Sequence, residues 1–520
     1  MRRSVVSVLG AALGLSLLAG TLPAQDSGTP PAAKRPVVLR IVLAARRGPV
    51  PGHSPLYYFG GFQTKTLVYE PLLRYGPGGV LEPALAESWS RSSDGLTWTF
   101  RLRKGVADHA GETVDAEAIR DHFVRVLGNP GNRWLGATAR IREVRAPDPW
   151  TVEVQMTEPW FLPGELPVVN PWHFVPPSAF DHEGFFRSAI GTGPFRLVAE
   201  DPGVFQNYEA HSSWWRGKPG VDRIEAKLLP NAWRENHEVL RALLAGDVDL
   251  VADGEGPVIP REELARVAGM ERFRIWRHPG SSVHFLVLNV GSGPLASRDA
   301  RRRVAAAVDR AALVEKGELG YAVPSTTMFR EGVAGWPAEG RTAPPEAPPP
   351  SGRTSLRLLL PAGASARLGR HAALLKDQLR PAGFDLTVEA PRDGEDFAAR
   401  SAEADLRLAV TNGQPYDPWV SLQALFLNDP VRSKRTAARG GAFWADARMQ
   451  RCILDAEAAP DDAGRARAFA AAQARLDEEV PVLPVFVNDR IAVSVAELEG
   501  LEFGANAYDL GLASVRLRNP

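Results

Sequence analysis

The chain has 520 residues, of which 44% are hydrophobic and 23% are charged, and its 61 basic side chains balance 61 acidic ones. This length exceeds one hydrophobic core and predicts two or three domains. The balanced charge excludes a bulk attraction for nucleic acid or anionic membranes. A single cysteine excludes an intramolecular disulfide and a cysteine metal cluster.

The N-terminus predicts export. Arg2 and Arg3 precede a run of Val, Leu, Ala, Gly and Ser over residues 5–19, and small residues follow as far as Ala24. This order is typical of a secretory signal peptide, and the apolar run is shorter than the ~20 residues that a membrane span needs. We therefore expect a cleaved signal peptide over residues 1–24 and a chain released into the periplasm.

Lipid anchoring is not expected. A lipoprotein needs a cysteine directly after the Leu-Ala-Gly of residues 18–20, and Thr21 stands there instead. The stretch 25–36 is polar and rich in proline, which predicts a flexible leader.

The next part of the chain predicts strands with one clear helix among them. An apolar, β-branched run and two alternating polar and apolar runs are typical of strands. Ala116, Ile119, Phe123 and Leu127 recur at helical spacing, with Asp115 placed to cap the helix. The predicted elements are strands at 37–43, 97–102 and 151–156 and a helix at 115–127.

The second half predicts an α/β lobe. A strand, a helix and a strand follow one another from residue 356, and this β-α-β order implies a parallel pair. A loop rich in Pro and Gly is expected at 335–353, and Pro481 should end the last long helix. The other predicted elements are strands at 283–289, 356–360 and 384–389 and helices at 299–309, 365–379 and 461–479.

Several short blocks, taken together, resemble the family 5 solute-binding proteins of peptide and nickel ABC importers. Each block alone is weak, but they follow the family order. We expect these blocks to support the fold rather than to contact a ligand, because each also has a structural reading such as a hairpin turn or a glycine turn. The blocks are residues 68–75, 82–89, 94–106, 115–117, 191–195, 214–219, 245–250, 288–289 and 301–310.

The resemblance implies an α/β fold, the two-lobed clamp of periplasmic binding proteins (type II, cluster C-like), with a subdomain inserted in the first lobe. Such clamps close about a hinge on their ligand, and crossings near Val283 and Asn488 would form that hinge. The implied first lobe combines residues 37–62, 190–282 and 490–520, the inserted subdomain covers 63–189, and the second lobe covers 283–489.

The ligand is harder to read. By resemblance, peptide binders hold the ammonium group of the peptide with an aspartate shortly before an acidic residue and proline in the second lobe. Here that position falls on Gln414 or Pro415, so the aspartate is missing. A buried ammonium needs an anion, and Asp417 is the candidate substitute.

The sequence around Tyr416 and Asp417 is more similar to the nickel-binding branch of the family than to the peptide binders. That branch binds nickel through a carboxylate chelator and one histidine directly after the Asp-Pro pair, where Trp419 stands here and cannot coordinate a metal. Its chelator-clamping arginines would correspond to Arg133 and, less well, to Asn170 or His173, since a bidentate arginine fits a carboxylate.

Neither ligand set is complete, so an aromatic pocket formed by Tyr416, Trp419 and Trp172 stays open as an alternative to aromatic core packing. The expected function is capture of a small peptide or a similar zwitterionic or carboxylate solute, with nickel-chelate binding as the alternative. The candidate ligand-binding residues are Arg133, Asn170, His173, Asn412, Tyr416, Asp417 and Trp419.

An enzyme is not expected. His237-Glu238 lacks the second histidine of a zinc protease helix, and the chain has neither a Gly-x-Ser-x-Gly elbow nor a P-loop. We predict no catalytic residue, no metal site and no cofactor. The expected partners are a small-molecule ligand and an ABC permease with its ATPase, bound by a monomer. A sensory or chaperone-like binder that does not serve transport is the remaining alternative.

Overall fold

The computed structural model describes residues 35–45, 62–76, 80–133, 135–167, 170–230, 236–254, 258–329, 333, 349, 352–411, 418–428, 444–459, 461–505 and 509–518. From Val37 onward they belong to one compact unit, Val37–Pro520. The predicted signal peptide, most of the leader and most of the predicted loop 335–353 lie outside the described residues.

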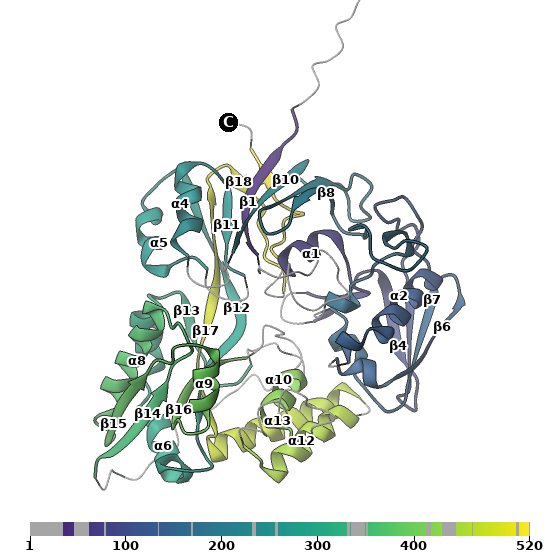
Figure 1. The fold of residues 1–520 in the computed structure, drawn as a ribbon. Helices are drawn as coiled ribbons and strands as arrows, with labels where there is room; N and C mark the ends of the chain where they lie inside the picture. Colours follow the sequence, from purple (N-terminus) through teal and green to yellow (C-terminus); the bar gives the residue numbers. More distant parts are fainter. Residues whose placement is uncertain are drawn as a thin grey trace, which may run out of the picture. The chain divides into compact units, whose positions relative to one another are not determined.

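One large mixed sheet organises this unit (Figure 1). Its strands follow the order β15-β14-β16-β12-β17-β11-β1-β10-β9-β8, and β13 pairs with β17 beside this path. The strands are β1 (Val38–Ala45), β8 (Phe195–Asp201), β9 (Phe205–Ala210), β10 (Arg223–Pro230), β11 (Leu250–Ala252), β12 (Phe273–Leu288), β13 (Ala322–Pro324), β14 (Thr354–Leu359), β15 (Phe384–Glu389), β16 (Leu406–Val410) and β17 (Val482–Val495).

The two longest strands, β12 and β17, run antiparallel along most of this sheet. Their register shifts between Pro279 and Val283, where proline cannot donate to the ladder. Val283 pairs with Val487, next to Asn488, so the two predicted crossings lie side by side on neighbouring strands. β12 begins ten residues before the predicted strand at 283–289.

The parallel pair predicted for the second half is confirmed. β14 and β15 are parallel and are joined through helix α8 (Ala366–Leu379). Helix α13 (Asp462–Glu479) ends as expected before Pro481, with Val480 in the left-handed conformation. The other helices and turns there are α6 (Arg298–Ala307), α7 (Arg310–Ala312), η7 (Leu313–Gly317), α9 (Gly394–Ser401), α10 (Pro418–Phe426), α12 (Ala447–Ala458) and η6 (Pro294–Ala296).

A separate four-stranded sheet has the order β4-β5-β7-β6 and is antiparallel. Its strands are β4 (Ala86–Arg91), β5 (Thr97–Leu102), β6 (Ile141–Asp148) and β7 (Thr151–Met156). Helix α2 (Ala116–Gly128) packs against it, and the Asp115 carboxylate accepts a hydrogen bond from the Ala118 amide, which confirms the predicted cap.

Short elements complete the chain. They are α1 (Phe62–Val68), β2 (Leu73–Tyr75), β3 (Leu81–Pro83), η2 (Pro130–Asn132), η3 (Ala137–Ala139), α3 (Leu162–Glu165), η4 (Asn170–Trp172), η5 (Pro177–Ala179), α4 (His237–Ala245), α5 (Arg261–Ala268), β18 (Leu498–Glu499) and β19 (Arg516–Leu517). None of the helices among the described residues is both long and apolar enough to cross a membrane.

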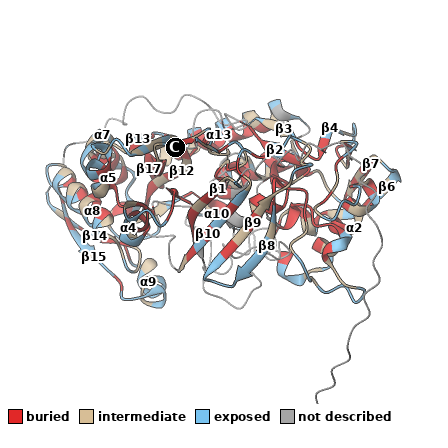
Figure 2. Ribbon diagram, turned by 90° about the horizontal axis from the view of Figure 1, so that it is seen from above, coloured by how far each residue is buried: buried red, intermediate tan, exposed pale blue. Residues whose placement is uncertain are grey.

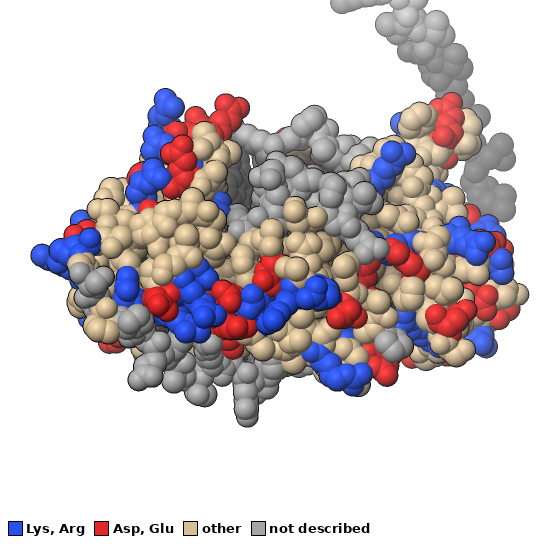
Figure 3. Space-filling model, turned by 90° about the horizontal axis from the view of Figure 1, so that it is seen from below, with Lys and Arg blue, Asp and Glu red and all other residues tan. Residues whose placement is uncertain are grey.

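Buried residues run through both faces of the large sheet and through the four-stranded sheet (Figure 2). One hydrophobic core joins the four-stranded sheet and α2 to α10, α12 and α13, so it includes both Phe100 and Phe469. On the face drawn in Figure 3, basic and acidic side chains are intermixed, in keeping with the balanced composition.

Candidate functional site

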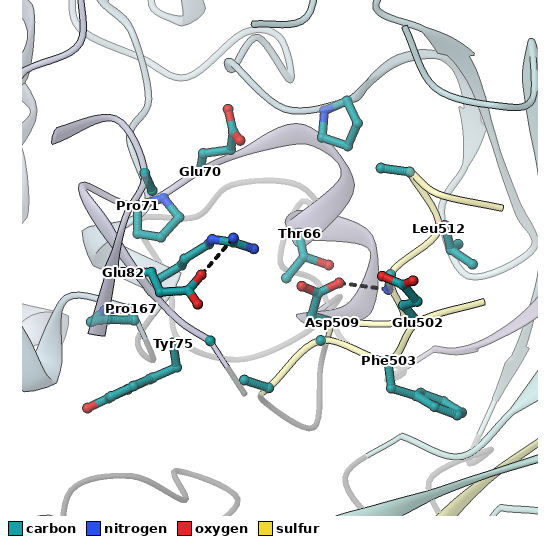
Figure 4. Close-up of a pocket in the computed structure, with 18 of the residues that line it drawn as sticks. Thr66, Glu70, Pro71, Tyr75, Glu82, Pro167, Glu502, Phe503, Asp509 and Leu512 are labelled. Atoms are coloured by element: carbon teal, nitrogen blue, oxygen red, sulfur yellow. Dashed lines mark hydrogen bonds and ion pairs between the residues drawn. The ribbon is translucent and has the colours of Figure 1, made fainter. Parts of the chain in front are cut away.

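The structure contains a cavity of about 590 Å³ bordered by segments that are far apart in the sequence (Figure 4). One wall comes from the end of α1, the stretch after it, and strands β2 and β3. The middle of β12 and the stretches 502–505 and 509–514 form another part. Figure 4 shows the Thr66, Glu82 and Asp509 side chains around the same open space. A cavity of this size suits a small molecule.

Two glycines fix the wall that follows α1. A Cβ on Gly191 would lie 2.1 Å from the Val68 carbonyl oxygen, and one on Gly193 would lie 2.5 Å from the Leu67 carbonyl oxygen. The Gly193 amide donates a hydrogen bond to the Val68 carbonyl. Only glycine allows the two backbones to approach so closely. The contact holds Tyr69 and Glu70, which both line the cavity.

Glu70 is the most buried acidic side chain in the cavity wall, with 8% of its surface exposed. Burial raises the pKa of its carboxyl group, and the hydrogen bond from Trp215 Nε1 at 2.8 Å and the charge of Arg216 partly oppose that rise. The guanidinium carbons of Arg103 and Arg216 each lie over the Trp215 ring, 4.5 Å from its centroid. This stack holds Arg216 at the cavity.

The cavity wall carries both charges. Arg74 and Glu82 form an ion pair with a nitrogen-to-oxygen distance of 2.7 Å. Asp509 accepts a hydrogen bond from the Gly511 amide at 2.8 Å, and its charge acts on Arg216. Glu502 is exposed at the same wall. The described lining thus offers cations and carboxylates within one space.

His173 lines the cavity, alone among the predicted ligand-binding residues whose side chains the structure describes. Its side chain is buried, with 4% exposed, and its Nε2 lies 3.4 Å from the Pro167 carbonyl oxygen. Burial lowers the pKa of His173 to about 4, so the ring is neutral at neutral pH. The neighbouring Lys65 is also buried, and burial lowers its pKa to about 7.

Of the other residues predicted in the inserted subdomain, Arg133 and Trp172 do not line the cavity. Arg133 is exposed at the end of η2, where its amide donates to the Pro130 carbonyl. Asn170 begins η4, but its side chain lies outside the described residues. Trp172 is buried, and its Nε1 donates to Glu165 at 2.8 Å.

Among the residues predicted in the second lobe, Trp419 is described and the rest are not. Its side chain is 2% exposed and packs edge-on against Trp160 at a centroid distance of 4.5 Å. The structure therefore places Trp419 in the hydrophobic core. Asn412, Tyr416 and Asp417 lie outside the described residues, so their role stays a prediction.

Sequence reasoning missed most of the cavity. Residues of the blocks at 68–75, 82–89 and 214–219, which were expected to support the fold, also line it. Their charged side chains within apolar motifs were the available signal. The stretches 502–505 and 509–514, which also line the cavity, offered no comparable signal. No group of three or more His, Cys, Asp or Glu side chains is arranged to hold a metal ion within the described ranges.

Comparisons with known proteins agree with this architecture. The model of the family described as bacterial extracellular solute-binding proteins, family 5 Middle, matches residues 80–432. The nickel-binding periplasmic protein of Escherichia coli (strain K12) is 25% identical over 506 residues, which cover 91% of this chain and 93% of that protein.

Solved structures show the same two-lobed fold. NikA from Brucella suis, in complex with Fe(III)-EDTA, has a TM-score of 0.77 and 24% identity, and the match covers 92% of this chain and 100% of NikA. DppA from Helicobacter pylori is an ABC transporter-associated periplasmic binding protein in complex with the peptide STSA. It has a TM-score of 0.68 and 19% identity, and the match covers 93% of this chain and 98% of DppA. The chain belongs to the bacterial extracellular solute-binding proteins of family 5, as the order of its sequence blocks predicted.

Proposed function

We propose that this chain is the solute-binding subunit of an ABC importer, and that it binds a small peptide or a similar zwitterionic solute in the cavity beside β12. Family membership supports the subunit assignment. The single observation that carries the choice of solute is the cavity wall, where Arg74 and Arg216 lie in the same space as Glu82 and Asp509.

A zwitterion suits this wall for an electrostatic reason. A charge taken out of water costs several kcal/mol unless an opposite charge or a set of hydrogen bonds receives it. Arg216 can receive a carboxylate, while Asp509 or Glu502 can receive an ammonium group. A solute with only one kind of charge would leave part of this wall unmatched.

A nickel chelate is the second candidate, favoured by the 25% identical relative named as nickel-binding. A carboxylate chelator could use Arg216 and Arg74. Against it, Trp419 replaces the histidine of the nickel branch and is buried in the core. The protein would therefore bind nickel only through a chelator and not as the bare ion.

The proposal also includes the export, the oligomeric state and the lobe boundaries that the sequence predicts. We infer a cleaved signal peptide over residues 1–24, no lipid anchor, a monomer in the periplasm and no catalytic activity. We also infer that residues 283–489 form the lobe that moves against the rest. The hinge would lie where β12 passes Val283 and β17 passes Asn488, at the register shift of this strand pair.

Native mass spectrometry of protein purified from the periplasm without unfolding tests the solute. We expect a bound small molecule that fragments as a peptide or another zwitterion, and its loss in an Arg216→Met variant. Arg133→Met is the matched control, because it removes an exposed guanidinium outside the cavity. A bound species kept by Arg216→Met and lost by Arg133→Met would overturn the cavity assignment in favour of the site predicted from sequence.

The same spectra separate the two candidates. A nickel chelate would carry the isotope pattern of nickel, and addition of a chelator-free nickel salt should not restore it. Stoichiometric binding of bare nickel ions would contradict the proposal.

A further inference from the structure

A buried seam joins the four-stranded sheet to the helices of the opposite lobe. Trp160, which follows β7, meets Trp419 of α10 edge-on at 4.5 Å between ring centroids. The neighbouring Phe161 ring lies 4.4 Å from the guanidinium of Arg465 on α13. Trp160 and Trp419 belong to one hydrophobic core although they lie 259 positions apart in the sequence.

An ion pair lies inside this seam. Arg140, between η3 and β6, holds Glu457 of α12 with a distance of 2.6 Å between Nη2 and Oε1, and each side chain is only 6% exposed. The same guanidinium lies 4.2 Å from the Trp160 ring centroid, and its Nη1 donates to the Gly136 carbonyl. Arg140 is thus fixed by its own subdomain and offers one edge to the opposite lobe.

A second polar contact crosses the seam. Arg91 Nη1, at the end of β4, donates to the Ala459 carbonyl at 3.2 Å. Arg140 and Glu457 are absent from the wall of the cavity, as are Trp160 and Trp419. A solute in the cavity therefore does not touch this ion pair.

We propose that Arg140 and Glu457 form a latch that holds the two lobes closed and sets the affinity for the solute from outside the cavity. This inference rests on the proposed clamp function. When the lobes separate, both side chains return to water. When the lobes close, each charge loses water and gains the other as its partner.

The latch acts on affinity through population. When only the closed form holds the solute, the apparent affinity is proportional to the fraction of the protein that is closed. The latch stabilises the closed form with and without solute, because the solute does not contact it. Loss of Arg140 leaves the Glu457 charge buried on closure without this guanidinium, which shifts such an equilibrium by about a hundredfold or more. Loss of Glu457 leaves Arg140 its pair with Glu158, which lies 2.8 Å from Nε and is 41% exposed.

The test measures the distance between the lobes in the full chain without any solute. Spin labels are placed on cysteines introduced at Val124 of α2 and Ala471 of α13, both exposed, after Cys452→Ser removes the native thiol. Double electron–electron resonance should give a single short distance for this background. Arg140→Met and Glu457→Gln should each add a longer distance that becomes the major population.

Two further variants separate a latch from a merely structural ion pair. Arg140→Met combined with Glu457→Met removes both charges of the latch and leaves only the 41% exposed Glu158, the other partner of Arg140, so it should restore the short distance. Apolar side chains can replace a buried pair. Arg367→Met is the matched control, since Arg367 and Glu318 form an Arg–Glu pair of 2.6 Å, 8% and 0% exposed, within one lobe. It should lower the melting temperature and leave the distance unchanged.

Each outcome decides the proposal. A longer distance in both single variants, its reversal in the double variant and its absence in Arg367→Met would support the latch. An unchanged short distance in Arg140→Met and Glu457→Gln would overturn it, whatever their melting temperatures. Because no solute is present, that failure would leave the solute-binding assignment intact, and the bound-mass experiment on Arg216 tests that assignment separately.

Discussion

Gly191→Ala should destabilise the chain at the wall of the cavity. The added Cβ would lie 2.1 Å from the Val68 carbonyl oxygen, 2.9 Å from the Val68 carbonyl carbon and 2.7 Å from Tyr69 Cδ1. An ordinary carbon-to-oxygen contact is about 3.3–3.6 Å. The backbone at the end of α1 must therefore move by about 1 Å, because a carbonyl group cannot turn away as a flexible side chain can.

The size of the effect follows from opposing contributions. Overpacking costs about 1–3 kcal/mol, and a backbone obstacle places this site at the upper end. The lower entropy of alanine in the unfolded chain returns about 0.4–1 kcal/mol. We expect a net loss of about 2 kcal/mol in the free energy of unfolding.

Gly128→Ala is the control for this measurement. Gly128 ends α2, and a Cβ there meets nothing within 4 Å. It should leave stability unchanged or raise it by up to about 1 kcal/mol, as alanine does in a helix. Urea denaturation followed by circular dichroism measures both variants. Equal midpoints for Gly191→Ala and Gly128→Ala would refute the reasoning from close backbone approach.

Three further predictions concern buried side chains. Trp419→Ala should lower the free energy of unfolding by about 3–5 kcal/mol in urea denaturation, because the ring is 2% exposed and packs on Trp160; a stability near that of the unaltered chain would show that the ring is not a core residue. Burial alone would raise the pKa of Glu318, but the hydrogen bond with His371 and the charge of Arg367 lower this pKa to about 2. The ionised Glu318 therefore stabilises the fold at pH values above the ordinary glutamate pKa, and this stabilisation is lost as the pH falls towards 2. Glu318→Gln should flatten this acid-side loss in melting curves, and an unchanged acid profile would count against it. Burial lowers the pKa of Lys65 to about 7, so folding releases a proton at pH values between 7 and the ordinary lysine pKa. Lys65→Met should therefore raise the melting temperature more at pH 6 than at pH 10. A gain in melting temperature that does not depend on pH would contradict this direction of the pKa shift.

The sequence alone determined the local elements and the family. Asp115 before a 3.6-residue apolar period placed α2 and its cap, and the strand-helix-strand order from residue 356 implied the parallel pair of β14 and β15. Both depend on interactions within a short stretch of chain or between consecutive elements. The ordered blocks carried the family assignment for the same reason, since order along the chain is itself a sequence property.

The local sequence did not predict the full length of β12, which begins ten residues before the predicted strand. The apolar stretch after Val283 was visible as a strand, and the sequence predicted that the strand begins there. In the structure the strand continues through this point, because β17 pairs with it on both sides of the register shift. A neighbouring strand from 200 residues further along decided what the local pattern could not.

The candidate site depended on tertiary structure in the same way. Glu70 and Trp215, 145 residues apart, share a hydrogen bond at the cavity, and Arg140 and Glu457, 317 residues apart, share an ion pair at the seam. The sequence left Trp419 open between an aromatic pocket and core packing, and its side chain lies buried in the hydrophobic core. Residue type and spacing describe what a side chain can do, but only the packing of distant segments sets which side chains share a cavity and which lose contact with water.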